Sequence, residues 1–122
     1  MKSMIIPAAC LVAFACAGLF VSVANAQDMA KTAGKNVKVL VDNDKIRVLE
    51  LTMPPGASTG VHSHGDNWVY FITGGEATQT KEGGKPEVAT RKAGESLWSG
   101  PVVHDTVNSG KNVVKTLVVE VK

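Results

Sequence analysis

Three histidines are the residues of this chain whose spacing could do chemistry. His62 and His64 lie two residues apart in the segment VHSHGDNWVY, and His104 is the only other histidine. In a strand, residues i and i+2 share a face and lie about 6.6 Å apart, at ~3.3 Å per residue. Two imidazoles placed in this way can converge on one metal ion at about 2.0–2.1 Å. Taken without His104, the pair His62 and His64 could equally lie on the polar surface face of a strand.

The elements that would position these histidines are short strands. After residue 36, turn-forming residues interrupt the chain every few positions, and the segments between them are rich in Val, Ile, Leu and Thr. Sustained 3.6-residue apolar periods are missing from these segments, which argues against helices. Many short strands separated by turns favour an antiparallel sandwich or barrel. We predict strands over residues 37–41, 46–53, 68–73, 76–80, 88–92, 96–99, 102–107 and 113–121.

The first 26 residues have the pattern of a secretory signal peptide. Lys2 gives a positive start, residues 5–23 are apolar or small, and Ala24-Asn25-Ala26 is an A-x-A cleavage pattern. An uncleaved membrane anchor is the alternative, because the apolar stretch is nearly long enough to span a bilayer. We expect cleavage after Ala26 and a periplasmic or secreted protein.

The rest of the chain is predicted to be one small domain without disulfides. Both cysteines, Cys10 and Cys16, lie inside the leader. We expect a signal peptide over 1–26, a flexible N-terminal arm over 27–36 and one β-domain over 37–122. The 13 basic and 11 acidic residues are interspersed. This distribution suggests neither nucleic acid nor, after signal cleavage, a membrane as partner.

The pattern around the histidines resembles the cupin family. From Gly56 to Gly75 the chain reads G-x5-H-x-H-x3-W-x6-G, which is the first cupin motif with Trp68 in place of its glutamate. The second motif is looser, since its glycine-to-proline spacing is one residue longer and its middle glycine is missing. Its four matching positions are Gly94, Pro101, His104 and Asn108.

This resemblance implies an all-β fold, a double-stranded β-helix or jelly-roll barrel, with a metal ion inside. The implied ligands are His62, His64 and His104. Trp68 cannot be the fourth ligand, because an indole has no lone pair to offer. The implied cofactor is a divalent transition metal (Fe, Ni, Zn, Cu or Mn), and the missing carboxylate weakens the binding of harder ions.

Several neighbouring side chains are candidates for the pocket lining or for a fourth ligand. Trp68 is a candidate lining residue because of its motif position, and core packing is its alternative. Tyr70 shares its face, and Gln79 lies on the predicted inward face of the next strand. Asp66 and Asn67 could also supply an oxygen ligand, although both residue types are typical of turns.

Two functions remain open at this stage. One is a metal-dependent enzyme, dioxygenase-like or isomerase-like, acting on a small molecule at open metal positions. The other is a non-catalytic periplasmic module that binds a small ligand or a metal, which the lack of an identifiable acid or base favours. A metal-free interaction domain is disfavoured, because all three histidines stand at motif positions. Pairing of the terminal strands, 37–41 and 113–121, could also give a homodimer.

Overall fold

The computed structural model describes residues 27–122, so the signal peptide expected over 1–26 lies outside the described residues. A short helix, α1 (Met29–Thr32), and a 3-10 turn, η1 (Gly34–Asn36), precede the strands. The strands are β1 (Val37–Asp42), β2 (Ile46–Met53), β3 (His62–His64), β4 (Asn67–Phe71), β5 (Gly75–Lys81), β6 (Glu87–Arg91), β7 (Ser96–Ser99), β8 (Val102–Asn108) and β9 (Val114–Val121). Within residues 27–122, no helix has the length and apolar character needed to cross a membrane.

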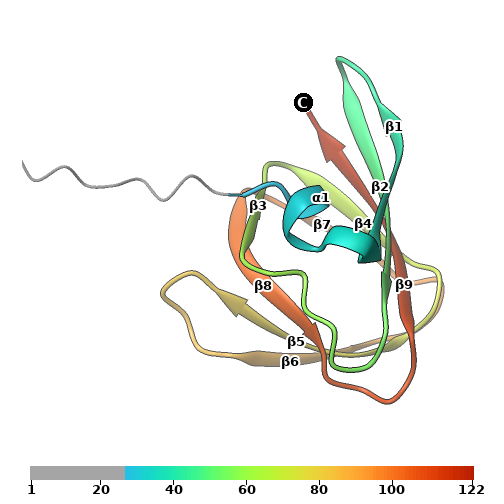
Figure 1. Ribbon diagram of the computed structural model, residues 1–122, viewed down its shortest axis with the longest axis vertical. Coiled ribbons are helices and arrows are strands. Elements are labelled where there is room, and N and C mark those ends of the chain that lie inside the picture. The colour runs from blue at the N-terminus through green and yellow to red at the C-terminus, as the bar shows by residue number, and fades with distance from the viewer. Residues whose placement is uncertain (1–26) are drawn as a thin grey trace, which may run out of the picture.

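The strands form two antiparallel sheets, as Figure 1 shows. The five-stranded sheet has the order β1-β2-β9-β4-β7, and the four-stranded sheet has the order β3-β8-β5-β6. Neighbours far apart in sequence, such as β2 and β9, pair along their whole length. This arrangement confirms the predicted all-β fold of the jelly-roll type.

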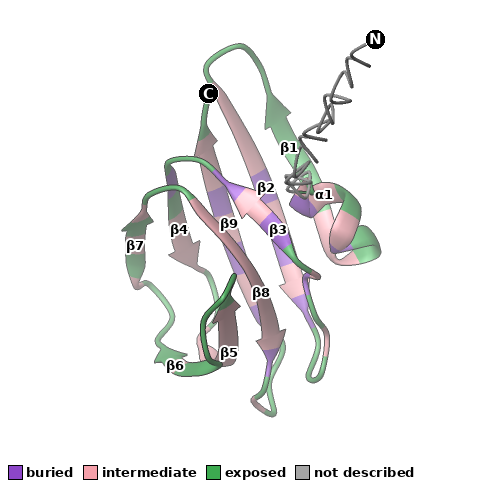
Figure 2. Cartoon of the chain, turned by 90° about the vertical axis from the view of Figure 1, so that its left-hand side faces the viewer, coloured by how far each residue is buried: buried purple, intermediate pink, exposed green. Residues whose placement is uncertain are grey.

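The core lies on the inner face of the five-stranded sheet. Along β2, Leu49, Leu51 and Met53 are buried and alternate with less buried residues, as expected for a strand with one covered face. Val118 of β9 joins them in one apolar cluster. Figure 2 shows the buried segments of β2, β3 and β9 in purple. The histidine-bearing strand β3 is therefore part of the covered interior.

Residues 27–36, which the sequence predicted as a flexible arm, pack against this core through α1. Met29 is 2% exposed, and Ala33, one helical turn later, is also buried in the apolar cluster. Asp28 caps α1, because its carboxylate accepts a hydrogen bond from the backbone N–H of Ala30 at 2.9 Å. Because the segment is mostly polar, its sequence did not indicate that Met29 and Ala33 belong to the core.

Candidate metal site

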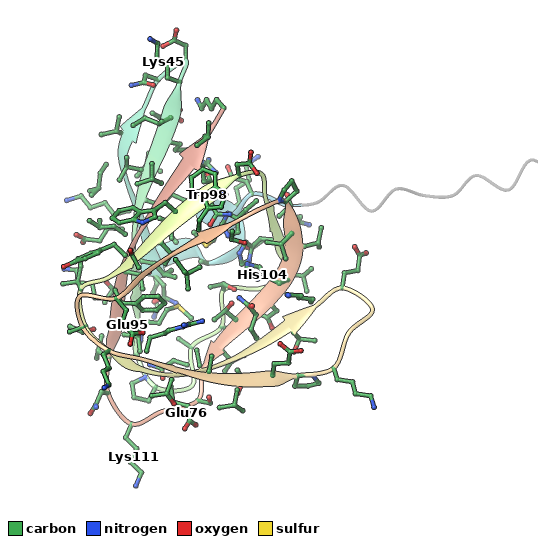
Figure 3. All side chains as sticks on the ribbon, turned by 180° about the vertical axis from the view of Figure 1, so that it is seen from behind. Lys45, Glu76, Glu95, Trp98, His104 and Lys111 are labelled. Atoms are coloured by element: carbon green, nitrogen blue, oxygen red, sulfur yellow. The ribbon has the colours of Figure 1, made fainter. Side chains whose placement is uncertain are left out.

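The three histidines converge because of the register between β3 and β8. His62 lies directly opposite His104, and side chains in such pairs share one face of the sheet. His64, two residues along β3, returns to the same face. One ring nitrogen from each histidine lies within 4.8 Å of those of the other two. Figure 3 labels His104 on β8, the strand that supplies the third imidazole.

Hydrogen bonds determine which nitrogens of His62 and His64 remain available. The Nδ1 of His62 lies 2.7 Å from the carbonyl oxygen of Gly60. The Nδ1 of His64 lies 2.8 Å from Oε1 of Glu120. Both oxygens can only accept, so each Nδ1 carries the proton and donates it. The two Nε2 atoms then face each other at 2.9 Å, which requires a shared proton or a cation between them.

Burial favours a cation rather than a shared proton between the two Nε2 atoms. It lowers the pKa of His62, and it lowers the pKa of His104 to about 4, where the nearby His62 adds to the effect. Both rings are therefore neutral near neutral pH, the form in which imidazole binds metals. The Nδ1 of His104 is buried without a hydrogen-bond partner. A separation of 2.9 Å also fits two nitrogens at about 2.0–2.1 Å from one ion.

An ion pair between Arg47 of β2 and Glu120 of β9 holds the carboxylate that orients His64. Glu120 accepts from His64 through Oε1 and from Nε of Arg47 through Oε2, the latter at 2.7 Å. Burial opposes ionisation of Glu120, but the hydrogen bonds from His64 and Arg47 outweigh it and lower the pKa of this carboxyl. A carboxylate on the second nitrogen of a metal-binding histidine fixes its tautomer and increases its basicity.

The histidines line a cavity of about 280 Å³ between the sheets. Gln79 lies in its wall, on the inward face of β5, and its side-chain amide approaches Thr106 at 3.5 Å. Lys81 and Arg91 also line the cavity, whereas none of its described lining residues is acidic. Lys81 is the register partner of His104, so a positive charge lies beside the histidine cluster.

β4 directs the rings of Trp68 and Tyr70 away from this cavity. Asn67, Val69 and Phe71 line the cavity, so the alternating residues Trp68 and Tyr70 point to the outer face. Their rings stack there with centroids 5.7 Å apart. The prediction that Trp68 and Tyr70 line the pocket is therefore wrong, and Tyr70 is also excluded as a fourth ligand.

Asn67 occupies the inward position that the sequence motif suggested for Trp68. It is 2% exposed. Its side-chain N–H group donates to the carbonyl oxygens of Gly65 and Ser99, at 2.9 and 3.4 Å. Asp66 is exposed and lies outside the cavity lining. Asp66 and Asn67 are both candidate oxygen ligands or turn residues by sequence, and only Asn67 lines the cavity.

Sequence reasoning missed Arg47 and Glu120, although a signal for both was present. Arg47 has the same strand parity as Leu49, and Glu120 has the same parity as Val118, so both charges point to the covered side. Charged residues are rarely buried without a partner. Opposite charges at core-facing positions of two strands could therefore have indicated a buried pair, which the register of β2 and β9 shows.

Comparison with known proteins identifies the fold family. No family model matches the chain, and no curated protein matches it. A cupin domain from Bordetella pertussis Tohama I is similar in structure, with a TM-score of 0.66 and 27% identity over 70% of this chain and 91% of that chain.

Two further solved structures extend the likeness. An RmlC-like cupin family protein with a double-stranded β-helix fold, from Methanocaldococcus jannaschii, has a TM-score of 0.60 and 20% identity over 79% of this chain and 87% of that one. An uncharacterised conserved protein with a double-stranded β-helix domain, from Klebsiella pneumoniae, has a TM-score of 0.56 and 21% identity over 80% and 89%. These neighbours and the two-sheet topology show that the chain has the cupin-type double-stranded β-helix fold, and together with the histidine motif they support its assignment to the cupin family.

Proposed function

We propose that this cupin binds a divalent transition metal ion through His62, His64 and His104. The observation that carries the proposal is the pair of Nε2 atoms facing each other at 2.9 Å while both Nδ1 atoms are engaged elsewhere. Iron, nickel, zinc, copper and manganese all accept imidazole ligands, and the softer ions are favoured because no carboxylate joins the set. Such an ion supplies a Lewis-acidic centre with open positions for a small molecule.

The small molecule that we propose is an anion with an apolar body. Lys81 and Arg91 contribute positive charge to the cavity wall, and no described lining residue opposes them. Thr116, another lining residue, has a buried hydroxyl without a partner, which a polar group of the ligand could satisfy. Most of the remaining wall is apolar, as is usual for small-molecule pockets. A carboxylate or an enolate meets these requirements.

Dioxygenase-like turnover is the enzymatic function that we propose for this centre. The described lining contains no carboxylate that could act as a general base, so reactions that depend on proton transfer by the protein, such as isomerisation, fit less well. The same lack of an acid or base supports a second candidate, a non-catalytic module that binds the anion or the metal.

Metal and anion binding test this proposal together. Purified protein is titrated with Zn²⁺, Co²⁺, Ni²⁺, Cu²⁺, Fe²⁺ and Mn²⁺, and the metal-loaded form is then titrated with a β-dicarbonyl anion. We expect Lys81→Met to weaken anion binding about tenfold, equivalent to ~1.4 kcal/mol. Lys85→Met, a matched change in the exposed turn between β5 and β6, should leave it unchanged. Absence of metal uptake contradicts the proposal.

Oxygen consumption separates the enzyme from the binding module. Each metal-loaded form is incubated with a panel of β-dicarbonyls, thiols and flavonols. Uptake of oxygen that depends on both metal and organic compound supports the dioxygenase-like function. Tight anion binding without oxygen uptake across the panel favours the non-catalytic module.

We also propose that the protein acts in the periplasm or outside the cell. The support is the sequence of the leader, with Lys2, the apolar stretch over 5–23 and the A-x-A pattern ending at Ala26. Mass spectrometry of the protein from the periplasmic fraction of a bacterial host should give an N-terminus at Gln27. Retention of the full-length chain in the membrane fraction contradicts this part of the proposal.

A further inference from the structure

The segment Gln27–Asn36, called the N-terminal strap below, lies against the strand that carries two of the three histidines. β3 is an edge strand of its sheet, and Figure 1 shows α1 beside it. The backbone carbonyl of Gln27 accepts a hydrogen bond from the backbone N–H of Ser63 at 3.0 Å. Ser63 stands between His62 and His64, so the strap is bonded to the centre of the ligand-bearing segment.

Asp28 of the strap ends a chain of hydrogen-bonded polar side chains that begins at His64. Its two carboxylate oxygens accept from Nη1 and Nη2 of Arg47, both at 2.7 Å. Arg47 also donates to Glu120, which in turn accepts from His64. The side chains of Arg47 and Glu120 are 17% and 12% exposed. Loss of Asp28 would leave half of the Arg47 guanidinium without its bidentate partner in a largely buried setting.

Thr32 of the strap packs on the group that orients His62. Gly60 has a φ of +69°, and a Cβ built there would lie 3.1 Å from the Cβ of Thr32. The carbonyl of this same glycine accepts the hydrogen bond from Nδ1 of His62. The strap thus contacts the Gly60 turn that supports His62, and it reaches Glu120, the support of His64, through Arg47. Its Met29 also lines the cavity.

We infer that docking of the N-terminal strap and metal binding are coupled. This inference rests on the proposed metal site. The docked strap holds Arg47, Glu120 and the Gly60 turn in the positions that aim the two Nε2 atoms at one point. Undocking releases Arg47 from Asp28 and allows Glu120 to turn away from His64. Because coupling between two binding events is reciprocal, the metal must tighten strap docking by the factor by which docking tightens metal binding.

Zinc affinity of an isosteric variant tests the first half of this coupling. Asp28→Asn keeps the size of the side chain and removes its charge. We expect it to weaken Zn²⁺ binding about tenfold, the lower end of the effect typical of outer partners of metal ligands. Asp44→Asn, the same change in the exposed turn between β1 and β2, should bind Zn²⁺ like the wild type. Equal affinities of wild type and Asp28→Asn overturn the coupling.

Hydrogen exchange of the strap tests the reciprocal half. Backbone amides of residues 27–36 should exchange more slowly when Zn²⁺ is added to the wild type. The His104→Ala variant removes a ligand on β8 and leaves the strap contacts intact, so Zn²⁺ should not slow exchange there. Exchange that is unaffected by bound Zn²⁺ in the wild type overturns the coupling alone, whereas failure of the wild type to bind any metal overturns the metal site and the coupling together.

Discussion

At the scale of single residues, the site depends on which ring nitrogen of His62 and of His64 is engaged in a hydrogen bond. The Gly60 carbonyl holds Nδ1 of His62, and the Glu120 carboxylate holds Nδ1 of His64. These two hydrogen bonds leave both Nε2 lone pairs directed at the same place. Neither histidine could be oriented by its own strand alone, because a strand sets the face of a side chain and not the rotation of its ring.

Replacement of Glu120 tests the role assigned to it. Glu120→Gln should weaken Zn²⁺ binding by about 10- to 100-fold, because the amide keeps the shape but loses the negative charge that polarises His64 and pairs with Arg47. Competition with a chromophoric chelator measures the affinity. Glu50→Gln is the matched control on β2, since Glu50 pairs at 3.4 Å with Lys115. Wild-type Zn²⁺ affinity in both variants would contradict this role of Glu120.

At the scale of elements, the pleat of β4 determines which of its side chains line the cavity. Asn67, Val69 and Phe71 face inward, so the two large aromatic residues between them are placed outside the cavity. A shift of one residue in a strand exchanges its two faces completely. The hydrogen bonds of the buried Asn67 side chain to the Gly65 and Ser99 carbonyls help to fix this parity.

Two alanine variants on β4 should therefore behave in opposite ways. Asn67→Ala should lower the free energy of unfolding by about 1 kcal/mol, because it removes the hydrogen bonds of a buried side chain to the Gly65 and Ser99 carbonyls. Trp68→Ala removes a ring from the outer face, so Zn²⁺ affinity should stay within about threefold of the wild type, or ~0.7 kcal/mol. Urea unfolding and zinc titration measure the two effects. A large loss of zinc affinity in Trp68→Ala would contradict the outward placement.

Most strands, and the convergence of the histidines, could be predicted from the sequence. Turn residues punctuate the chain, and His-x-His with a later His104 in a matching motif placed all three histidines together. The faces of β4 could not be predicted, because the run from Trp68 to Thr73 is almost wholly apolar and offers no polar alternation to mark the inner side. The packing of residues 27–36 against the core could not be predicted either, because it involves Asp28 meeting Arg47, a partner far away in sequence.

At the scale of the whole molecule, burial in the barrel keeps His62 and His104 neutral by lowering the pKa of each. The folded protein lowers the pKa of His104 to about 4, from an ordinary value of 6.5. The pKa of His62 is also lowered by burial. An unfolded chain would bind protons at these side chains below pH 6.5, whereas the folded chain resists them. Acid therefore favours the unfolded state through these two residues.

The metal-free protein should lose stability as the pH falls from 6.5 towards 4.5. The contribution of His62 and His104 is fully present above their unfolded pKa of 6.5 and is progressively lost as the pH approaches the folded value for His104 of about 4. Urea unfolding in the presence of a chelator, at several pH values within this window, measures the trend. The His104→Ala variant should show a weaker dependence on pH. A wild-type free energy of unfolding that stays constant over the window would contradict the buried neutral state.

Metal content measured beside two ligand variants tests the central claim most directly. The wild type, His62→Ala and His104→Ala are purified without chelator, incubated with each candidate divalent ion, desalted and measured by elemental analysis. We predict close to one transition-metal ion per chain in the wild type and little in either variant, because each variant removes one of three converging ligands. Circular dichroism verifies that the variants are folded. Wild-type protein that retains no more metal than the two folded variants, with every ion tested, would contradict the account.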